Sequence, residues 1–89
     1  MPTIAEFYGI MIMMFYRGEH NPPHFHAYYG EQEVVIEIAT LRVMEGKMKP
    51  RTLSYVMEWA ARHQDELMAN WDRARRHEPL THIIGLDQE

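Results

Sequence analysis

The sequence contains no cysteine, which excludes disulfide bridges and thiolate metal sites and makes a reducing cytosol the natural environment. Long apolar runs are missing too. The longest, Ile10 to Tyr16, is far too short to span a bilayer. The residues after Met1 show neither the charged region nor the cleavage site of a signal peptide. We therefore expect a cytoplasmic protein that does not enter a membrane.

Positive charge is scarce as well. Nine Lys and Arg residues stand against 13 Asp and Glu residues, and the formal net charge is −4. The strongly basic footprint of nucleic-acid-binding proteins is absent, so nucleic acid stays open only as a weaker partner class. The chain has 89 residues, 46% of them hydrophobic, and is expected to fold as a single domain over residues 1–89 around one modest core.

Hydrophobic patterning predicts an α+β fold. The apolar run of residues 9–16 indicates a central strand buried on both faces, and residues 41–44 read as a short further strand. Helical spacing extends from Pro50 to about His77, a length that leaves room for a break near Gln64. Residues 82–84 suit a closing strand or an extended tail. We expect an antiparallel sheet of three to four strands packed on one long C-terminal helix.

A hairpin is predicted between two alternating segments, residues 24–29 and 32–39. Gly30 and Glu31 between them suit a two-residue type II′ turn, which has glycine first. The turn sets a register in which opposed residues share a face. The expected pairs are Tyr29 with Gln32, Tyr28 with Glu33, His26 with Val35, and His24 with Glu37.

Three of the six histidines occur in one segment, His20-Asn21-Pro22-Pro23-His24-Phe25-His26. Histidine is the commonest metal ligand and a proton carrier near neutral pH. His20, His24 and His26 are therefore candidate ligands for zinc or a similar divalent metal, and Glu37 is placed to join them from the next strand. The spacing matches no standard zinc signature.

Two other readings of the histidines remain open. In the first, His24, His26 and Glu37 are catalytic without metal, with the carboxylate orienting an imidazole for acid–base chemistry. Tyr28 and Arg17 would then bind an anion such as a phosphate, as in a small hydrolase or ribonuclease. In the second, the histidines are structural and satisfy backbone groups near the prolines. Whether the protein is an enzyme stays undecided at this level.

The predicted helix carries a second candidate binding surface. Tyr55 and Trp59 lie one turn apart and away from the main apolar stripe, and exposed Tyr and Trp favour protein interfaces. The other reading is that the sheet or the C-terminal tail covers them. The remaining histidines, His63, His77 and His82, are scattered and are expected at the surface or its boundary.

Several segments together resemble the DUF4160 family of small, mostly bacterial proteins of unknown function. They are Pro2-Thr3-Ile4, Phe7-Tyr8-Gly9-Ile10, the segment from His20 to Gly30, Val56-Met57-Glu58-Trp59-Ala60 and Glu66-Leu67-Met68-Ala69-Asn70-Trp71. Many members have Asp where Glu19 stands. The family resembles one half of small two-gene cassettes, which implies a toxin–antitoxin-like or regulatory pairing. The leading expectation is a cytosolic interaction or regulatory module that acts with a small partner protein, with a homo-oligomer also open.

Overall fold

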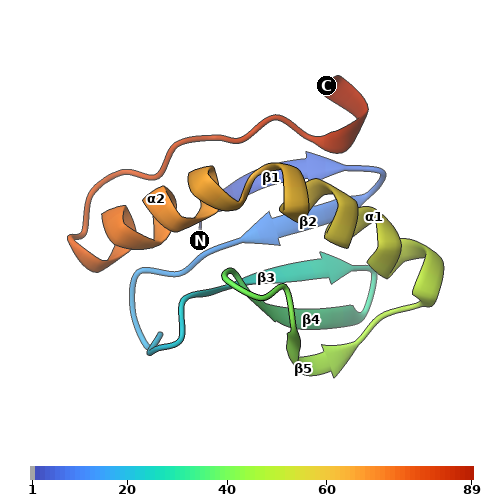
Figure 1. Ribbon diagram of the computed structural model, residues 1–89, viewed down its shortest axis with the longest axis horizontal. Helices are drawn as coiled ribbons and strands as arrows, with labels where there is room; N and C mark the ends of the chain where they lie inside the picture. The colour runs from blue at the N-terminus through green and yellow to red at the C-terminus, as the bar shows by residue number, and fades with distance from the viewer. Residues whose placement is uncertain (1) are drawn as a thin grey trace.

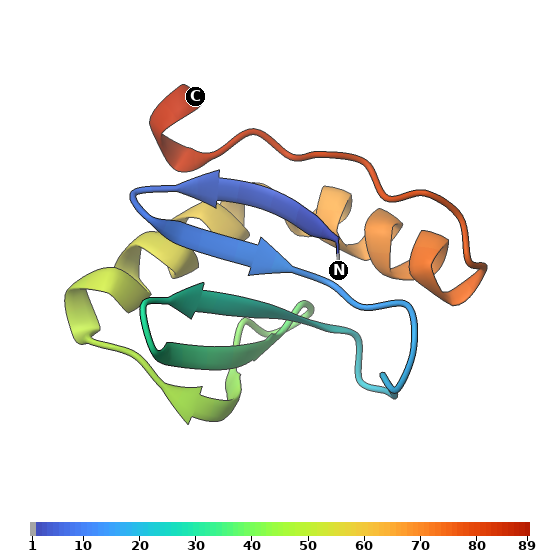
Figure 2. The same cartoon turned by 180° about the vertical axis from the view of Figure 1, so that it is seen from behind.

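A computed structural model describes residues 2–89 of the chain. One antiparallel sheet contains five strands in chain order: β1 (Thr3–Phe7), β2 (Ile10–Met13), β3 (His24–Tyr29), β4 (Gln32–Glu37) and β5 (Val43–Lys47). Helices α1 (Pro50–Arg62) and α2 (Gln64–Arg75) lie on one face of this sheet (Figures 1 and 2). An extended segment and the short 3-10 helix η1 (Leu86–Gln88) end the chain. Within residues 2–89, no helix is both long enough and apolar enough to cross a membrane.

The α+β class is confirmed, but the expected helix is wrong in detail. Two helices replace the single long one, because α1 ends at Arg62 and α2 begins at Gln64. His63 alone interrupts them, with a φ of −129°. Its backbone N–H donates to the carbonyl of Ala60, three residues earlier, which tightens the last turn of α1. The break therefore falls one residue before Gln64.

The sheet also has one or two strands more than expected. β1 escaped prediction because it does not alternate strictly. Ile4 and Ala5 are consecutive and both buried, at the point where the register with β2 shifts. The predicted central strand is reduced to β2, which is not buried on both faces. Ile10 and Ile12 are buried toward the helices, and Met11 and Met13 on the other face are half-buried. β5 begins later than expected and continues through Gly46.

The β3–β4 hairpin follows the prediction residue by residue. Tyr29 pairs with Gln32, Tyr28 with Glu33, His26 with Val35, and His24 with Glu37. Gly30 has a φ of +58°, and Glu31 is not among the residues with positive φ, as the two central positions of a type II′ turn require. The alternation of the two strands therefore separates an apolar face from a polar one.

The core lies between the helices and the apolar face of the sheet. Phe25, Ala27, Val34 and Ile36 of the hairpin are fully buried there. Trp59 of α1 is the largest fully buried side chain. The C-terminal segment runs along the outer edge of β1, where the Ile83 N–H donates to the carbonyl of Ile4 at 2.8 Å (Figure 1). The opposite face of the sheet carries no helix (Figure 2).

Candidate functional site

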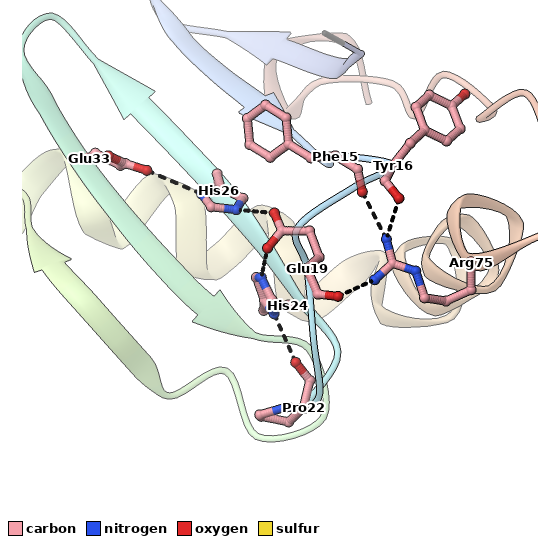
Figure 3. Close-up of polar contacts among 8 residues, drawn as sticks. All are labelled: Phe15, Tyr16, Glu19, Pro22, His24, His26, Glu33 and Arg75. Carbon is pink, nitrogen blue, oxygen red and sulfur yellow. Dashed lines mark hydrogen bonds and ion pairs between the residues drawn. The ribbon is translucent and has the colours of Figure 1, made fainter. Parts of the chain in front are cut away.

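Two histidines of β3 converge on one carboxylate from the loop between β2 and β3. Nε2 of His24 lies 2.8 Å from Oε2 of Glu19, and Nε2 of His26 lies 2.6 Å from Oε1 of the same residue (Figure 3). His24 and His26 are two positions apart on a strand, so they point to the same face. Gly18 precedes Glu19 with a φ of +76°, a conformation that favours glycine. The loop thus brings Glu19 between the two rings.

The outer nitrogens of both rings also have oxygen partners. Nδ1 of His24 lies 2.8 Å from the carbonyl oxygen of Pro22, and Nδ1 of His26 lies 3.1 Å from Oε2 of Glu33 (Figure 3). A carbonyl oxygen accepts only, so Nδ1 of His24 is the donor to Pro22. The contacts of the two Nδ1 atoms therefore orient both rings so that their Nε2 atoms point toward Glu19.

The proton inventory of this arrangement is unusual. Four ring nitrogens each face an oxygen, so four hydrogen bonds need four protons. Two neutral imidazoles supply one proton each, and an ionised carboxylate supplies none. With both rings neutral, each carrying its proton on Nδ1, and Glu19 ionised, the two contacts between the Nε2 atoms and Glu19 have no proton. Two added protons would complete these contacts, and one divalent metal ion would replace them.

Aromatic rings and burial set the environment of the cluster. His24 is only 6% exposed and lies against Trp71 of α2, with ring centroids 5.1 Å apart. The ring centroid of His26 lies 4.7 Å from that of Phe15 and 6.3 Å from that of Tyr28. Burial raises the pKa of Glu19, but hydrogen bonds and positive charge from the two histidines outweigh it, and the pKa falls below its usual value. Burial and the neighbouring Glu33 raise the pKa of Tyr28.

Glu37 does not belong to this cluster. It faces His24 across the strands, as predicted. Its carboxylate oxygen, however, accepts hydrogen bonds from Thr40 at 3.0 Å and from Arg42 at 3.2 and 3.3 Å. Thr40 and Arg42 lie in the short segment between β4 and β5, and their hydrogen bonds hold the Glu37 carboxylate away from the cluster. The predicted His24–Glu37 pair is correct as a register and wrong as a hydrogen-bonded pair, and Glu19 takes that place.

His20 borders the site without joining it. Its side chain is exposed and lines a cavity of about 220 Å³ together with Glu19, His24, His26 and Glu33. Among residues 2–89, the group whose ligand atoms lie within 4.8 Å of one another is Glu19, His24 and His26. Two of the three predicted metal ligands are thus brought together, and the third predicted ligand lies on the cavity wall.

Tyr28 and Arg17 are the two residues predicted to bind an anion. Tyr28 stacks beside His26, but Arg17 is exposed and makes no hydrogen bond with Tyr28 or the histidines in the described part of the chain. The loop between β2 and β3 is contacted by another arginine, Arg75 of α2. Its guanidinium donates to backbone carbonyls rather than to a side chain (Figure 3).

The predicted interface of Tyr55 and Trp59 on the helix is wrong for Trp59, which lies in the core. Trp59 is 0% exposed, and its Nε1 donates to the carbonyl of Ile84 at 2.8 Å, so it cannot form an exposed binding edge. The C-terminal segment covers it, which was the alternative reading. Tyr55 is half-buried against Tyr8, with ring centroids 5.0 Å apart. Tyr8 itself is 51% exposed.

One further histidine departs from expectation. His63 is buried against Trp59, and its two nitrogens contact the carboxylates of Glu66 and Glu89. Burial lowers the pKa of His63, but these two carboxylates outweigh it, so the pKa is raised above its usual value. His77 and His82 are exposed, as expected.

Fold and site together define a small α+β protein with two histidines and one carboxylate gathered on a sheet face. The model of the family described as Domain of unknown function (DUF4160) matches residues 9–72. The chain belongs to this family, and the match includes the whole cluster. No curated protein and no solved structure matches the chain in the corresponding comparisons.

Sequence reasoning missed Glu19 because strand alternation says nothing about which loop residue returns to a strand. The family resemblance nevertheless contained a signal. The resemblance implies Asp in many members where this chain has Glu19, which would place a carboxylate at the position in both cases. The signal is an acidic residue directly before the histidine segment.

Proposed function

We propose that this protein binds one divalent metal ion through Nε2 of His24, Nε2 of His26 and the carboxylate of Glu19. The observation that carries the proposal is the pair of hydrogen bonds behind the rings, from His24 to the Pro22 carbonyl and from His26 to Glu33. Metal-ligating histidines almost always donate their second nitrogen to a carbonyl or carboxylate. One ion of charge +2 also replaces the two extra protons that the cluster otherwise needs.

The ligand set favours a catalytic rather than a structural metal. Structural zinc sites use four protein ligands, whereas catalytic ones use three and leave a position for water or substrate. Two histidines and one carboxylate are such a set, which also suits iron(II). The cavity beside Glu19, His24 and His26 offers space for the exchangeable ligand. Activation of a metal-bound water for hydrolysis is the chemistry that this arrangement favours.

The test is metal analysis and titration on untagged protein, because a histidine tag would bind metal itself. We expect one equivalent of zinc, manganese or nickel to bind and to raise the melting temperature. His24→Ala, His26→Ala and Glu19→Gln should each lower the affinity by more than the roughly 10- to 100-fold typical of outer-shell substitutions. The exposed histidines provide matched controls, and His77→Ala and His82→Ala should bind as the unmodified protein does.

Two results would oppose the proposal. One is the absence of bound metal together with no thermal shift on adding zinc, manganese or nickel. The other is binding that His77→Ala or His82→Ala abolishes while the cluster variants retain it.

A partner protein is a second proposed function, and a different surface supports it. Tyr8 is 51% exposed and Tyr29 is 38% exposed. The Tyr29 ring covers Gly9, next to Tyr8, and Tyr55 packs against Tyr8 from α1. Tyrosine is enriched at protein interfaces. Capture from native lysate should retain a small protein, and Tyr8→Ser combined with Tyr29→Ser should lose it. Recovery of the monomer alone would count against this function.

A further inference from the structure

Arg75, at the C-terminal end of α2, donates hydrogen bonds to the loop that carries Glu19. Its guanidinium donates to the carbonyl of Phe15 at 2.9 Å, of Tyr16 at 3.3 Å and of Glu19 itself at 3.3 Å (Figure 3). All three carbonyls belong to the loop between β2 and β3, which lies 56 to 60 residues before Arg75 in the chain. Arginine can serve several acceptors at once because its planar group presents five N–H donors in a fixed fork.

The same helical turn also contacts the other side of the cluster. The guanidinium of Arg75 lies 4.2 Å from the centre of the Trp71 ring, and the Trp71 ring packs against His24 at 5.1 Å. Residues 71 and 75 are four apart and therefore stand on one face of α2. One turn of helix thus holds the backbone of Glu19 and the ring of His24.

We infer that Arg75 is a positioning residue for the proposed metal site and that it couples the docking of α2 to metal occupancy. The inference rests on the proposed function. Its physical basis is that a metal ligand must be held within a fraction of an ångström, and a loop residue needs outside support for that. Because binding linkage is reciprocal, an ion held by Glu19 and His24 must in turn stabilise the contacts of α2 with the loop.

Lysine cannot replace arginine here. A single ammonium is a compact charge on a flexible stem and cannot reproduce the flat stack on Trp71 together with the fork of donors. The neighbouring Arg76 provides a matched control. It lies one position further along, is exposed, and pairs with Glu78 instead of the loop.

The experiment is a zinc titration against a competing chromophoric chelator, using untagged full-length protein. The unmodified chain, Arg75→Ala, Arg75→Lys and Arg76→Ala are compared. We expect both Arg75 variants to bind zinc about 10- to 100-fold more weakly, as for other outer-shell positions, and Arg76→Ala to bind like the unmodified chain. Arg75→Lys keeps the charge and the stem, so it serves if Arg75→Ala does not fold.

A second readout separates positioning from a merely structural role. Zinc should slow hydrogen exchange of the α2 amides in the unmodified chain and in Arg76→Ala, and this slowing should be lost in both Arg75 variants. Folded Arg75 variants that bind zinc as tightly as the unmodified chain would overturn the inference alone. An unmodified chain that binds no zinc would overturn the proposed function and the inference with it.

Discussion

Nδ1 of His26 lies 3.1 Å from Oε2 of Glu33, on the side of the ring opposite Glu19. The two residues come from neighbouring strands, and Glu33 pairs with Tyr28, which lies two positions beyond His26 on β3. This contact fixes which nitrogen of His26 faces the cluster, and it raises the basicity of the ring toward a cation.

Removing this contact should weaken metal binding without removing a ligand. We expect Glu33→Ala to lower zinc affinity by about 10- to 100-fold and Glu33→Gln to lower it less, because an amide oxygen still accepts a hydrogen bond. Calorimetric titration measures both. Glu31→Ala, in the exposed turn of the same hairpin, is the control. Equal losses in Glu31→Ala and Glu33→Ala would indicate a general charge effect instead of this contact.

Glu19 should contribute an acid-sensitive part of the stability of the metal-free protein. Its pKa is lowered from 4.5 in the folded state. The contribution is therefore complete above the unfolded pKa and is lost as the pH falls through the folded value. Urea unfolding with a chelator present, from about pH 7 to about pH 3, should show the advantage over Glu19→Gln shrinking in the acid range. An advantage that stays constant there would contradict the assignment.

His63 should respond to pH in the opposite direction. Its pKa is raised from 6.5 by Glu66 and Glu89, despite burial. Its contribution is present below pH 6.5 and is lost as the pH rises through the higher folded value. We expect NMR titration to show the His63 ring and the amides of residues 83–85 changing together on that alkaline side. Glu89→Gln should lower the midpoint, whereas His82→Gln, at an exposed position, should leave it unchanged.

Gly46 should not tolerate a side chain. It has a φ of +85°, and a Cβ atom there would lie 2.1 Å from the backbone oxygen of Glu33. Gly18 has a similar φ of +76°, but a Cβ atom would meet nothing within 4 Å. Gly18→Ala should therefore cost only the conformational penalty of about 1–2 kcal/mol, and Gly46→Ala clearly more. Urea unfolding of the two variants measures the difference, and equal losses would contradict the steric argument.

The sequence predicted the parts of the fold that depend on neighbours in the chain. The Gly30 turn and strict alternation were sufficient for the complete β3–β4 register, because a two-residue turn leaves one pairing. Alternation also separated the buried Phe25 from the histidine face. The face shared by His24 and His26 is the part of the site that follows from this local information.

The parts that failed depend on contacts between distant segments. A helical wheel shows that Trp59 is displaced from the main stripe, but Ile84, which accepts its hydrogen bond, is 25 positions away in the chain. By register, Glu37 is the carboxylate opposite His24. In the structure, it accepts hydrogen bonds from Thr40 and Arg42 instead. Arg75 donates to the carbonyl of Glu19, 56 residues earlier in the chain. No periodic pattern in the sequence predicts a contact between a loop and the end of a helix.

The three proposed metal ligands come from one short stretch, residues 19–26. Few bonds separate them, so an unfolded chain loses little entropy in bringing them together. If the proposed site binds metal, such a segment would keep part of its affinity for a cation in the unfolded chain, and any affinity of the unfolded chain subtracts from the stability that a ligand confers. Zinc would therefore stabilise this fold less than its affinity for the native site alone would suggest, and capture of the ion would be able to precede folding.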